Sequence, residues 1–202
     1  MPTPEQIVAH HEPDPDENPW VAGNPPIEQV QLVPYDPNWP DVYDALARDL
    51  RTALAGAALH LEHVGSTSVP GLPAKPVIDI DLTVNDPASE ASYAPPLEAI
   101  GYRLTVREPS WHQHRCFRLD QPRVNLHVFG PDSPELLRHQ LFRDWLRIHP
   151  DDRNLYARAK EDAIPGGGDV TAYNARKEPV IREIYGRVFA AARWPAPSLT
   201  KD

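Results

Sequence analysis

Two aspartates one residue apart, Asp79 and Asp81, stand in the otherwise apolar run 77–84. Side chains alternate along a strand that rises about 3.3 Å per residue, so both carboxylates project from one face, about 7 Å apart. Carboxylates rarely enter a core unpaired, and a divalent cation that shares oxygen ligands with a substrate phosphate is a natural partner. The alternative is the solvent-facing half of an amphipathic strand, which Asp-x-Asp alone does not exclude.

A turn suited to binding phosphate precedes these aspartates in the segment Gly65-Ser66-Thr67-Ser68. Its glycine allows a close backbone approach, and the three hydroxyl residues can direct side chains and N–H groups toward an anion. An ordinary Gly-Ser turn with a helix cap is the alternative. In the order strand, Gly-Ser, short turn and strand bearing Asp-x-Asp, a nucleotide's phosphates meet metals held by the aspartates. We therefore expect both aspartates to face one cleft with Gly65 and Ser66.

Basic side chains near these segments are candidates for neutralising phosphate charge. We expect this role for Lys75, Arg115, Arg118 and Lys177. The alternative for Lys75 is a solvated loop lysine, and for each arginine it is an exposed strand position. Lys177 is expected on a helix at the opposite wall of the cleft, with a structural contact between helices as the alternative.

The elements that position these residues follow from hydrophobic periodicity. Apolar residues at helical spacing predict a helix over 39–54, with Asn38 and Asp41 as its N-terminal cap. Strands are predicted at 30–33, 59–64, 77–84, 102–106, 115–119 and 123–129. Further helices are predicted at 89–100, 137–148, 155–163 and 173–192, with a kink or restart at Pro179. The expected fold class is α/β (α+β), a mixed sheet flanked by helices with C-terminal helices.

Composition bounds the function. The chain has 202 residues, of which 41% are hydrophobic and 24% charged, as in an ordinary globular domain. A net charge of −9 argues against a protein that holds long nucleic acid, and it favours a small substrate. No apolar run approaches the roughly 18 residues of a membrane span, and the start resembles no signal peptide, so we expect a cytoplasmic protein without a membrane partner. The single cysteine, Cys116, is expected to be a buried small hydrophobe.

The chain is predicted to contain one domain, with tails at both ends. Residues 1–27 hold seven prolines and an acidic run, with only Ile7, Val8 and Trp20 to bury, so we expect a Pro-rich acidic arm that contributes little to folding. The domain is expected to span 28–192, and 193–202 to form a C-terminal tail. The glycines at 166–168 lack the Lys-Ser/Thr ending of a P-loop and are expected to form a flexible connector.

Several spaced motifs, taken together, resemble the GrpB family, a branch grouped with the nucleotidyltransferase superfamily. The resemblance covers about 30–189 and rests on the segments 33–40, 62–72, 74–81, 125–128 and 142–150, and on Tyr156, Lys160, Tyr173 and Lys177. It implies a nucleotidyltransferase-like fold. Superfamily members use Gly-Ser for the nucleotide phosphates, the paired acids for Mg²⁺ and usually a third acid on a neighbouring strand.

The third acid is absent from this sequence. The matching strand offers Asn125 and His127, and Asn125 also departs from the histidine that is usual in the family. We expect His127 to replace the acid as a metal ligand or general base, which would shift the preference from Mg²⁺ towards Mn²⁺ or Zn²⁺. Two further histidines, His112 and His114, leave a zinc site with His63 and His127 as an alternative to ordinary hydrogen bonding.

The expected function is metal-dependent nucleotidyl transfer from a nucleoside triphosphate to a small acceptor, with Mg²⁺, or Mn²⁺, as cofactor. Asp79, Asp81 and His127 are expected to hold the metal and carry catalysis. One alternative is a nucleotide- or coenzyme-binding module that lost turnover with the third acid. Relatives joined to a dephospho-coenzyme A kinase domain favour such an accessory role. The other is a metal-dependent hydrolase, and the acceptor and oligomeric state stay open.

Overall fold

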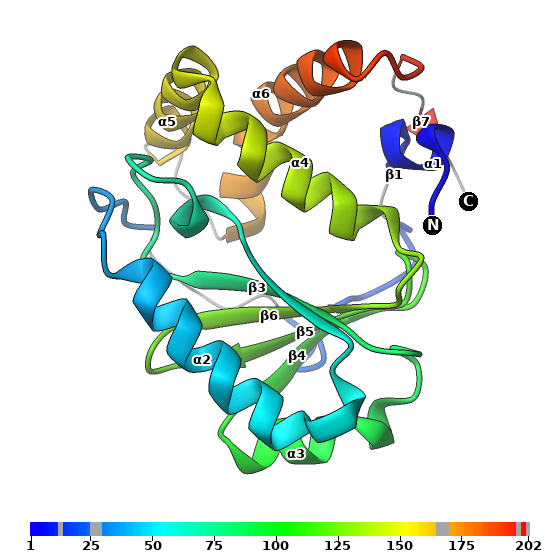
Figure 1. Ribbon diagram of the computed structural model, residues 1–202. Helices are drawn as coiled ribbons and strands as arrows, with labels where there is room; N and C mark the ends of the chain where they lie inside the picture. The colour runs from blue at the N-terminus through cyan, green and yellow to red at the C-terminus, as the bar shows by residue number, and fades with distance from the viewer. Residues whose placement is uncertain (12–13, 25–29, 165–169, 197–198, 201–202) are drawn as a thin grey trace.

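The computed structural model describes residues 1–11, 14–24, 30–164, 170–196 and 199–200. Within these ranges, a five-stranded sheet lies between two layers of helices (Figure 1). One face is covered by α2 (Trp39–Leu54) and α3 (Ala94–Ala99). Over the other face lie α4 (Pro134–Ile148), α5 (Pro150–Ala163) and α6 (Val170–Ala191). The connector expected at 166–168 falls outside the described residues.

The spatial order of the strands is β2-β3-β6-β5-β4. Their bounds are β2 (His60–Val64), β3 (Ile78–Thr83), β4 (Arg103–Glu108), β5 (His114–Leu119) and β6 (Val124–Phe129). Strands β3 and β6 pair in parallel, and the other neighbouring pairs are antiparallel. The predicted fold class, a mixed sheet flanked by helices with a helical C-terminal part, is confirmed.

Strand β3 divides its side chains between a core and a polar face. Ile78, Ile80 and Leu82 are at most 3% exposed and belong to the same core as Leu46 and Leu50 of α2. The two aspartates alternate with these residues and face the layer of α4. The apolar half of the strand thus fixes which way its carboxylates point.

The N-terminal segment packs against the helical layer through two of the three apolar residues that the sequence offers there. Ile7 and Val8 of α1 (Pro4–Val8) are 3% and 1% exposed and share a core with residues of α4, α5 and α6. Arg138 of α4 donates hydrogen bonds to the carbonyl oxygens of Ile7, at 2.6 Å, and Ala9, at 2.9 Å. Two apolar residues between prolines are enough for this contact because the helical layer supplies the rest of the core.

The N-terminal segment makes two further backbone contacts, one with the C-terminal segment and one with the edge of the five-stranded sheet. Strand β1 (His10–His11) pairs in parallel with β7 (Leu199–Thr200), so the two ends of the chain meet (Figure 1). Farther on, the carbonyl of Pro19 accepts from the N–H of Arg107, and the N–H of Val21 donates to Thr105. The arm therefore extends the surface of edge strand β4.

Two expected elements are shorter than the sequence predicts. The strand expected at 30–33 is a single bridge between Val33 and Ala74. The helix expected at 89–100 divides into the 3-10 turn η3 (Glu90–Ser92) and α3. Prolines follow Ala94 directly and suit the first turn of a helix, where the missing N–H has no partner to lose, so α3 begins there.

Helix ends also differ from expectation. Asn38 makes no side-chain cap to α2, because its backbone is already helical, with φ −81° and ψ −12°, whereas a capping residue is extended. The 3-10 turn η1 (Ala55–Ala57) follows α2, whereas α6 runs continuously past Pro179 without a restart. Across the described ranges, no helix is both long and apolar enough to span a membrane.

Candidate active site

Gly65 brings the end of β2 against Asp79 of β3. Its φ of 67° and ψ of −171° lie in a backbone region open essentially to glycine alone. A Cβ built on it would lie 2.8 Å from the Cβ of Asp79 and would overlap the carboxylate. The 3-10 turn η2 (Ser66–Ser68) begins at this contact. The Gly-Ser turn and the first aspartate therefore form one site.

Asp79 is half-buried and held by side chains of β6. Asn125 Nδ2 donates to Asp79 Oδ1 at 2.8 Å, and His127 Nε2 lies 3.9 Å from the same oxygen. Burial alone would raise the pKa of Asp79, but His127, Asn125 and the charge of Lys75 outweigh it and lower that pKa. The group is thus a carboxylate at neutral pH, and it can attract a cation.

Asp81 shares this face but is closed off beneath α4, with 1% of its surface exposed. The Nδ1 atom of His139 lies 2.9 Å from Asp81 Oδ2 and 3.1 Å from Oδ1. Burial works against the charged imidazole, yet the Asp81 carboxylate raises the pKa of His139 to about 9. Asp81 therefore lies in an ion pair with an imidazolium, rather than open in the cleft. Sequence reasoning missed His139, although its place on the helix after the sheet was a usable signal.

A chain of hydrogen bonds leads away from the Asp79 side of the site. Glu108 Oε2 lies 2.6 Å from His114 Nδ1, and His114 Nε2 lies 3.0 Å from His127 Nδ1. Burial lowers the pKa of His114 well below its usual range, so this histidine is neutral. With Glu108 ionised, the only consistent arrangement has Nδ1–H donors on both histidines. The other ring nitrogen of His127, Nε2, faces Asp79.

Three of the four lysines in the chain gather beside the Gly-Ser turn. Lys160 Nζ donates to Ser66 Oγ at 3.2 Å and to the carbonyl of Pro73. The ammonium groups of Lys75 and Lys177 lie 5.5 and 5.2 Å from the ring centroid of Tyr173. Burial, reinforced by the charge of Lys177, lowers the pKa of Lys160 to about 7. Sequence reasoning named Lys75 and Lys177 as phosphate ligands but not Lys160, which lies closest to the turn's hydroxyl.

The other two hydroxyl residues of the turn have structural partners. Ser68 Oγ donates to the carbonyl of Gly65 at 2.6 Å. Thr67 Oγ1 donates to the carbonyl of Val77 and lies 3.1 Å from His63 Nε2, and its residue is 1% exposed. These contacts shape the turn, so both hydroxyl groups, expected to face an anion, bond to the protein itself.

The two predicted phosphate-binding arginines lie on opposite faces of the sheet. Arg115 faces away from the site, where it donates to Glu90 Oε1 at 2.6 Å and to the carbonyl of Gln113. Its side chain is therefore not among the groups that the structure brings together with Gly65 and Asp79. Arg118 pairs across the strands with Asn125, so it lies on the site face.

A histidine zinc site does not form. His63 lies on the other face of the sheet, stacked on Tyr43 of α2 with ring centroids 4.8 Å apart. It therefore cannot join His114 and His127. In the part of the chain that the structure describes, no three His, Cys, Asp or Glu residues converge as a metal-binding group.

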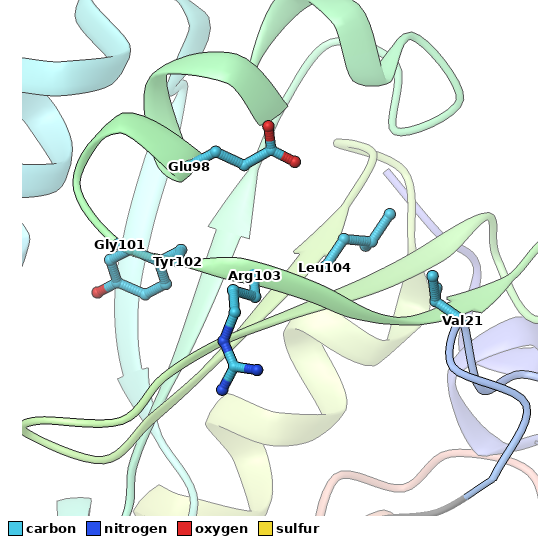
Figure 2. Close-up of a pocket in the computed structure, with 6 residues that line it drawn as sticks. All are labelled: Val21, Glu98, Gly101, Tyr102, Arg103 and Leu104. Atoms are coloured by element: carbon cyan, nitrogen blue, oxygen red, sulfur yellow. The ribbon is translucent and has the colours of Figure 1, made fainter.

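Two adjoining cavities open beside the site. A small one, about 80 Å³, is lined by Gly65 and Ser66 and by residues of α4, α5 and α6. A large one, about 640 Å³, lies between the N-terminal segment and the same helices. The residues common to both are His139, Phe142, Tyr156 and Tyr185. Figure 2 shows a different hollow, at the start of β4, whose lining includes none of the candidate site residues.

Comparisons with known proteins agree on one family. The GrpB protein family model matches residues 29–187. A UPF0157 protein of Halalkalibacterium halodurans is 46% identical over 162 residues, which are 80% of this chain and 83% of that protein. A dephospho-CoA kinase of Mycolicibacterium paratuberculosis is 36% identical over 187 residues, covering 79% of this chain but 46% of that protein. The crystal structure of the conserved protein GrpB from Enterococcus faecalis has a TM-score of 0.71 and 28% identity, covering 81% of this chain and 99% of that one. The chain therefore belongs to the GrpB family.

Proposed function

We propose that this protein transfers a nucleotidyl group from a nucleoside triphosphate to a small acceptor. The observation that carries the proposal is the contact between the Gly65 turn and Asp79, with three lysines beside it. A triphosphate needs a close backbone approach and positive charge at one place, and carboxylates beside the reacting phosphate would hold the cation that its oxygens require. The Gly65 turn contacts both a carboxylate, Asp79, and a lysine, Lys160, which supports this combination.

The lysines support the phosphate end of the proposal. Lys160 is 2% exposed and has a lowered pKa because its surroundings give its charge little compensation. A bound triphosphate would supply that compensation and return Lys160 to the charged form. Lys75 and Lys177 would add two further ammonium groups on the same side.

The carboxylates fit a cation of the Mg²⁺ type. This ion is usually bound by one or two carboxylates together with substrate phosphates, so a protein cage of three ligands is not required. Asp79 and Asp81 would hold it once His139 releases Asp81, and the oxygen and imidazole donors here also suit Mn²⁺. When bound, the metal supplies positive charge to the phosphate oxygens.

His127 is the proposed base for the acceptor. In the reaction, a bond forms from the acceptor oxygen to the α-phosphorus, while the bond from that phosphorus to the leaving pyrophosphate breaks. The acceptor's proton passes to His127 Nε2, the Nδ1 proton of His127 moves to His114, and that of His114 moves to Glu108. Burial raises the pKa of Glu108, which suits it to receive a proton.

Calorimetry with the four nucleoside triphosphates, with and without Mg²⁺ or Mn²⁺, tests nucleotide binding. Changing both aspartates to asparagine should abolish the metal-stimulated part of binding, whereas Asp120→Asn, at an exposed ion pair with Arg103, should leave it unchanged. Lys160→Met should weaken binding at least tenfold with or without metal. Nucleotide affinity that responds to neither metal nor these changes would refute the proposal.

A second candidate is a nucleotide- or coenzyme-binding module without turnover. One observation favours it: Asn125, at the position of the third acid, donates a hydrogen bond to Asp79 and offers no further carboxylate. Release of pyrophosphate separates the two functions. Under the transferase proposal His127→Ala should reduce that release, and under the module proposal there is none to reduce.

A further inference from the structure

The large cavity shares four lining residues with the small cavity beside Gly65 and has further lining of its own. It is walled by the end of β4 with Trp111, by α4, α5 and α6, and by five N-terminal residues: His10, His11, Asp14, Glu17 and Pro19. Its volume, about 640 Å³, suits a small-molecule ligand. The aromatic rings of Phe142, Tyr156 and Tyr185 connect it to the hollow beside Gly65. The two cavities therefore lie on either side of these shared rings.

The two arginines and the imidazolium that line the cavity each have a carboxylate partner. Arg138 Nε lies 3.1 Å from Glu135 Oε1, and Arg182 Nε lies 3.0 Å from Glu178 Oε1. The imidazolium of His139 is paired with Asp81. Burial lowers the pKa of His10 to about 4, so that side chain is neutral.

The negative groups are in excess. Asp14, Glu17 and Glu108 also line the cavity, and the ion pairs among the described residues give none of them a lysine or arginine partner. Glu17 accepts a hydrogen bond from the N–H of Ser110 at 3.1 Å, which holds it next to Trp111. Burial raises the pKa of Glu108, consistent with a charge that its surroundings compensate only in part.

We propose that this cavity binds the acceptor and that the acceptor is a small hydroxylated molecule carrying a protonated amine. Its ammonium would lie between Glu17 and Glu108, against the face of Trp111, where a cation gains from both carboxylates and ring. Its hydroxyl would point past the shared aromatic rings towards His127. The word acceptor rests on the proposed nucleotidyl transfer, whereas the binding of an amine does not.

Three sugars of one shape test the charge preference: glucosamine, glucose and glucuronate. We expect saturation-transfer NMR of the full chain at about pH 6.5, without nucleotide, to show glucosamine binding at least tenfold tighter than glucose, and no binding of glucuronate. Glu17→Gln with Glu108→Gln should weaken glucosamine binding at least fivefold. The matched control, Glu98→Gln, removes a carboxylate that lines the hollow of Figure 2 and should have no effect.

Equal binding of glucosamine and glucose, tighter binding of glucuronate, or no binding of any of the three would overturn the proposal. Unchanged affinity in the double variant would overturn the assignment to this cavity. This experiment contains no nucleotide, so its result is independent of the calorimetry. Glucosamine binding together with a lack of nucleotide binding would refute the transferase proposal and leave the amine site standing. The converse result, Mg²⁺-dependent nucleotide binding without a preference for glucosamine, would refute only the proposal that the acceptor carries an amine.

Discussion

Replacing Gly65 with alanine tests the close contact on which the site depends. The φ and ψ of Gly65 cost a non-glycine residue about 1 to 3 kcal/mol. Overlap of the new Cβ with Asp79 adds about 1 to 3 kcal/mol, as overpacking does elsewhere. We therefore expect Gly65→Ala to lower the free energy of unfolding by about 2 to 6 kcal/mol.

The chain offers a matched control in Gly71. Its φ is also positive, at 80°, but a Cβ built there meets no atom within 4 Å. Gly71→Ala should therefore show only the backbone part of the effect, about 1 to 2 kcal/mol. Urea unfolding followed by circular dichroism gives both values from the shift in midpoint at constant slope.

A double-mutant cycle separates overlap from strain. In a background of Asp79→Gly the overlap is gone, so Gly65→Ala should cost about 1 to 3 kcal/mol less than in the wild type. The cycle also works in a chain whose single Gly65→Ala variant is only marginally folded, because the relieved double variant remains measurable. Equal destabilisation by Gly65→Ala and Gly71→Ala, with no coupling to Asp79, would refute the contact.

Three further predictions concern the arm and two charged groups. Ile7→Ala should lower the free energy of unfolding by about 2 to 5 kcal/mol in urea, and Val21→Ala, at a site 47% exposed, by under about 0.5; equal small losses would contradict a packed arm. Hydrogen bonding to Arg107 lowers the pKa of Glu90 from 4.5 to about 2, so its stabilisation is complete above about pH 4.5 and lost as pH falls towards 2. Glu90→Gln should therefore show a smaller drop in melting temperature on acidification, and an equal drop would count against the pairing. The pKa of Lys160 is lowered to about 7, so the unfolded chain binds more protons than the folded one between about pH 7 and 10.5, and stability rises with pH there. Lys160→Met should abolish this rise in the melting temperature. A rise that persists in the variant would show that another group causes it.

The strand carrying the aspartates could be predicted because its own residues determine its faces. Apolar residues alternate with polar ones along β3, and burial of one set leaves the other on the opposite face whatever the rest of the fold does. The same reasoning located β5 and β6 and the helix that became α2. It failed for Arg115 because both faces of β5 mix polar and apolar residues: Arg115 alternates with Phe117, and Cys116 alternates with Arg118, so the pattern does not show which face meets the site.

The arm and Lys160 could not be predicted because their partners are distant in sequence. Arg138 reaches Ile7 across 131 residues, and Lys160 reaches Ser66 across 94. Local periodicity describes each segment alone and says nothing of which helix meets which turn. Two apolar residues in a Pro-rich segment, or one lysine in a charged helix, carry no sign in the sequence of the distant segment that they contact.

Helix α4 supplies the positive partners of two carboxylates in the sheet. It contributes His139 to Asp81 and Arg143 to Glu62, so two carboxylates of neighbouring strands are neutralised by one helix. These two contacts differ in what would break them. Arg143 Nη1 also donates to the carbonyl of His63 at 2.9 Å, which ties the helix to β2, whereas His139 can leave Asp81 by turning its own side chain. Under the proposed function, a cation between the aspartates would require the His139 side chain to turn but no movement of α4, and its charge would replace that of the displaced imidazolium.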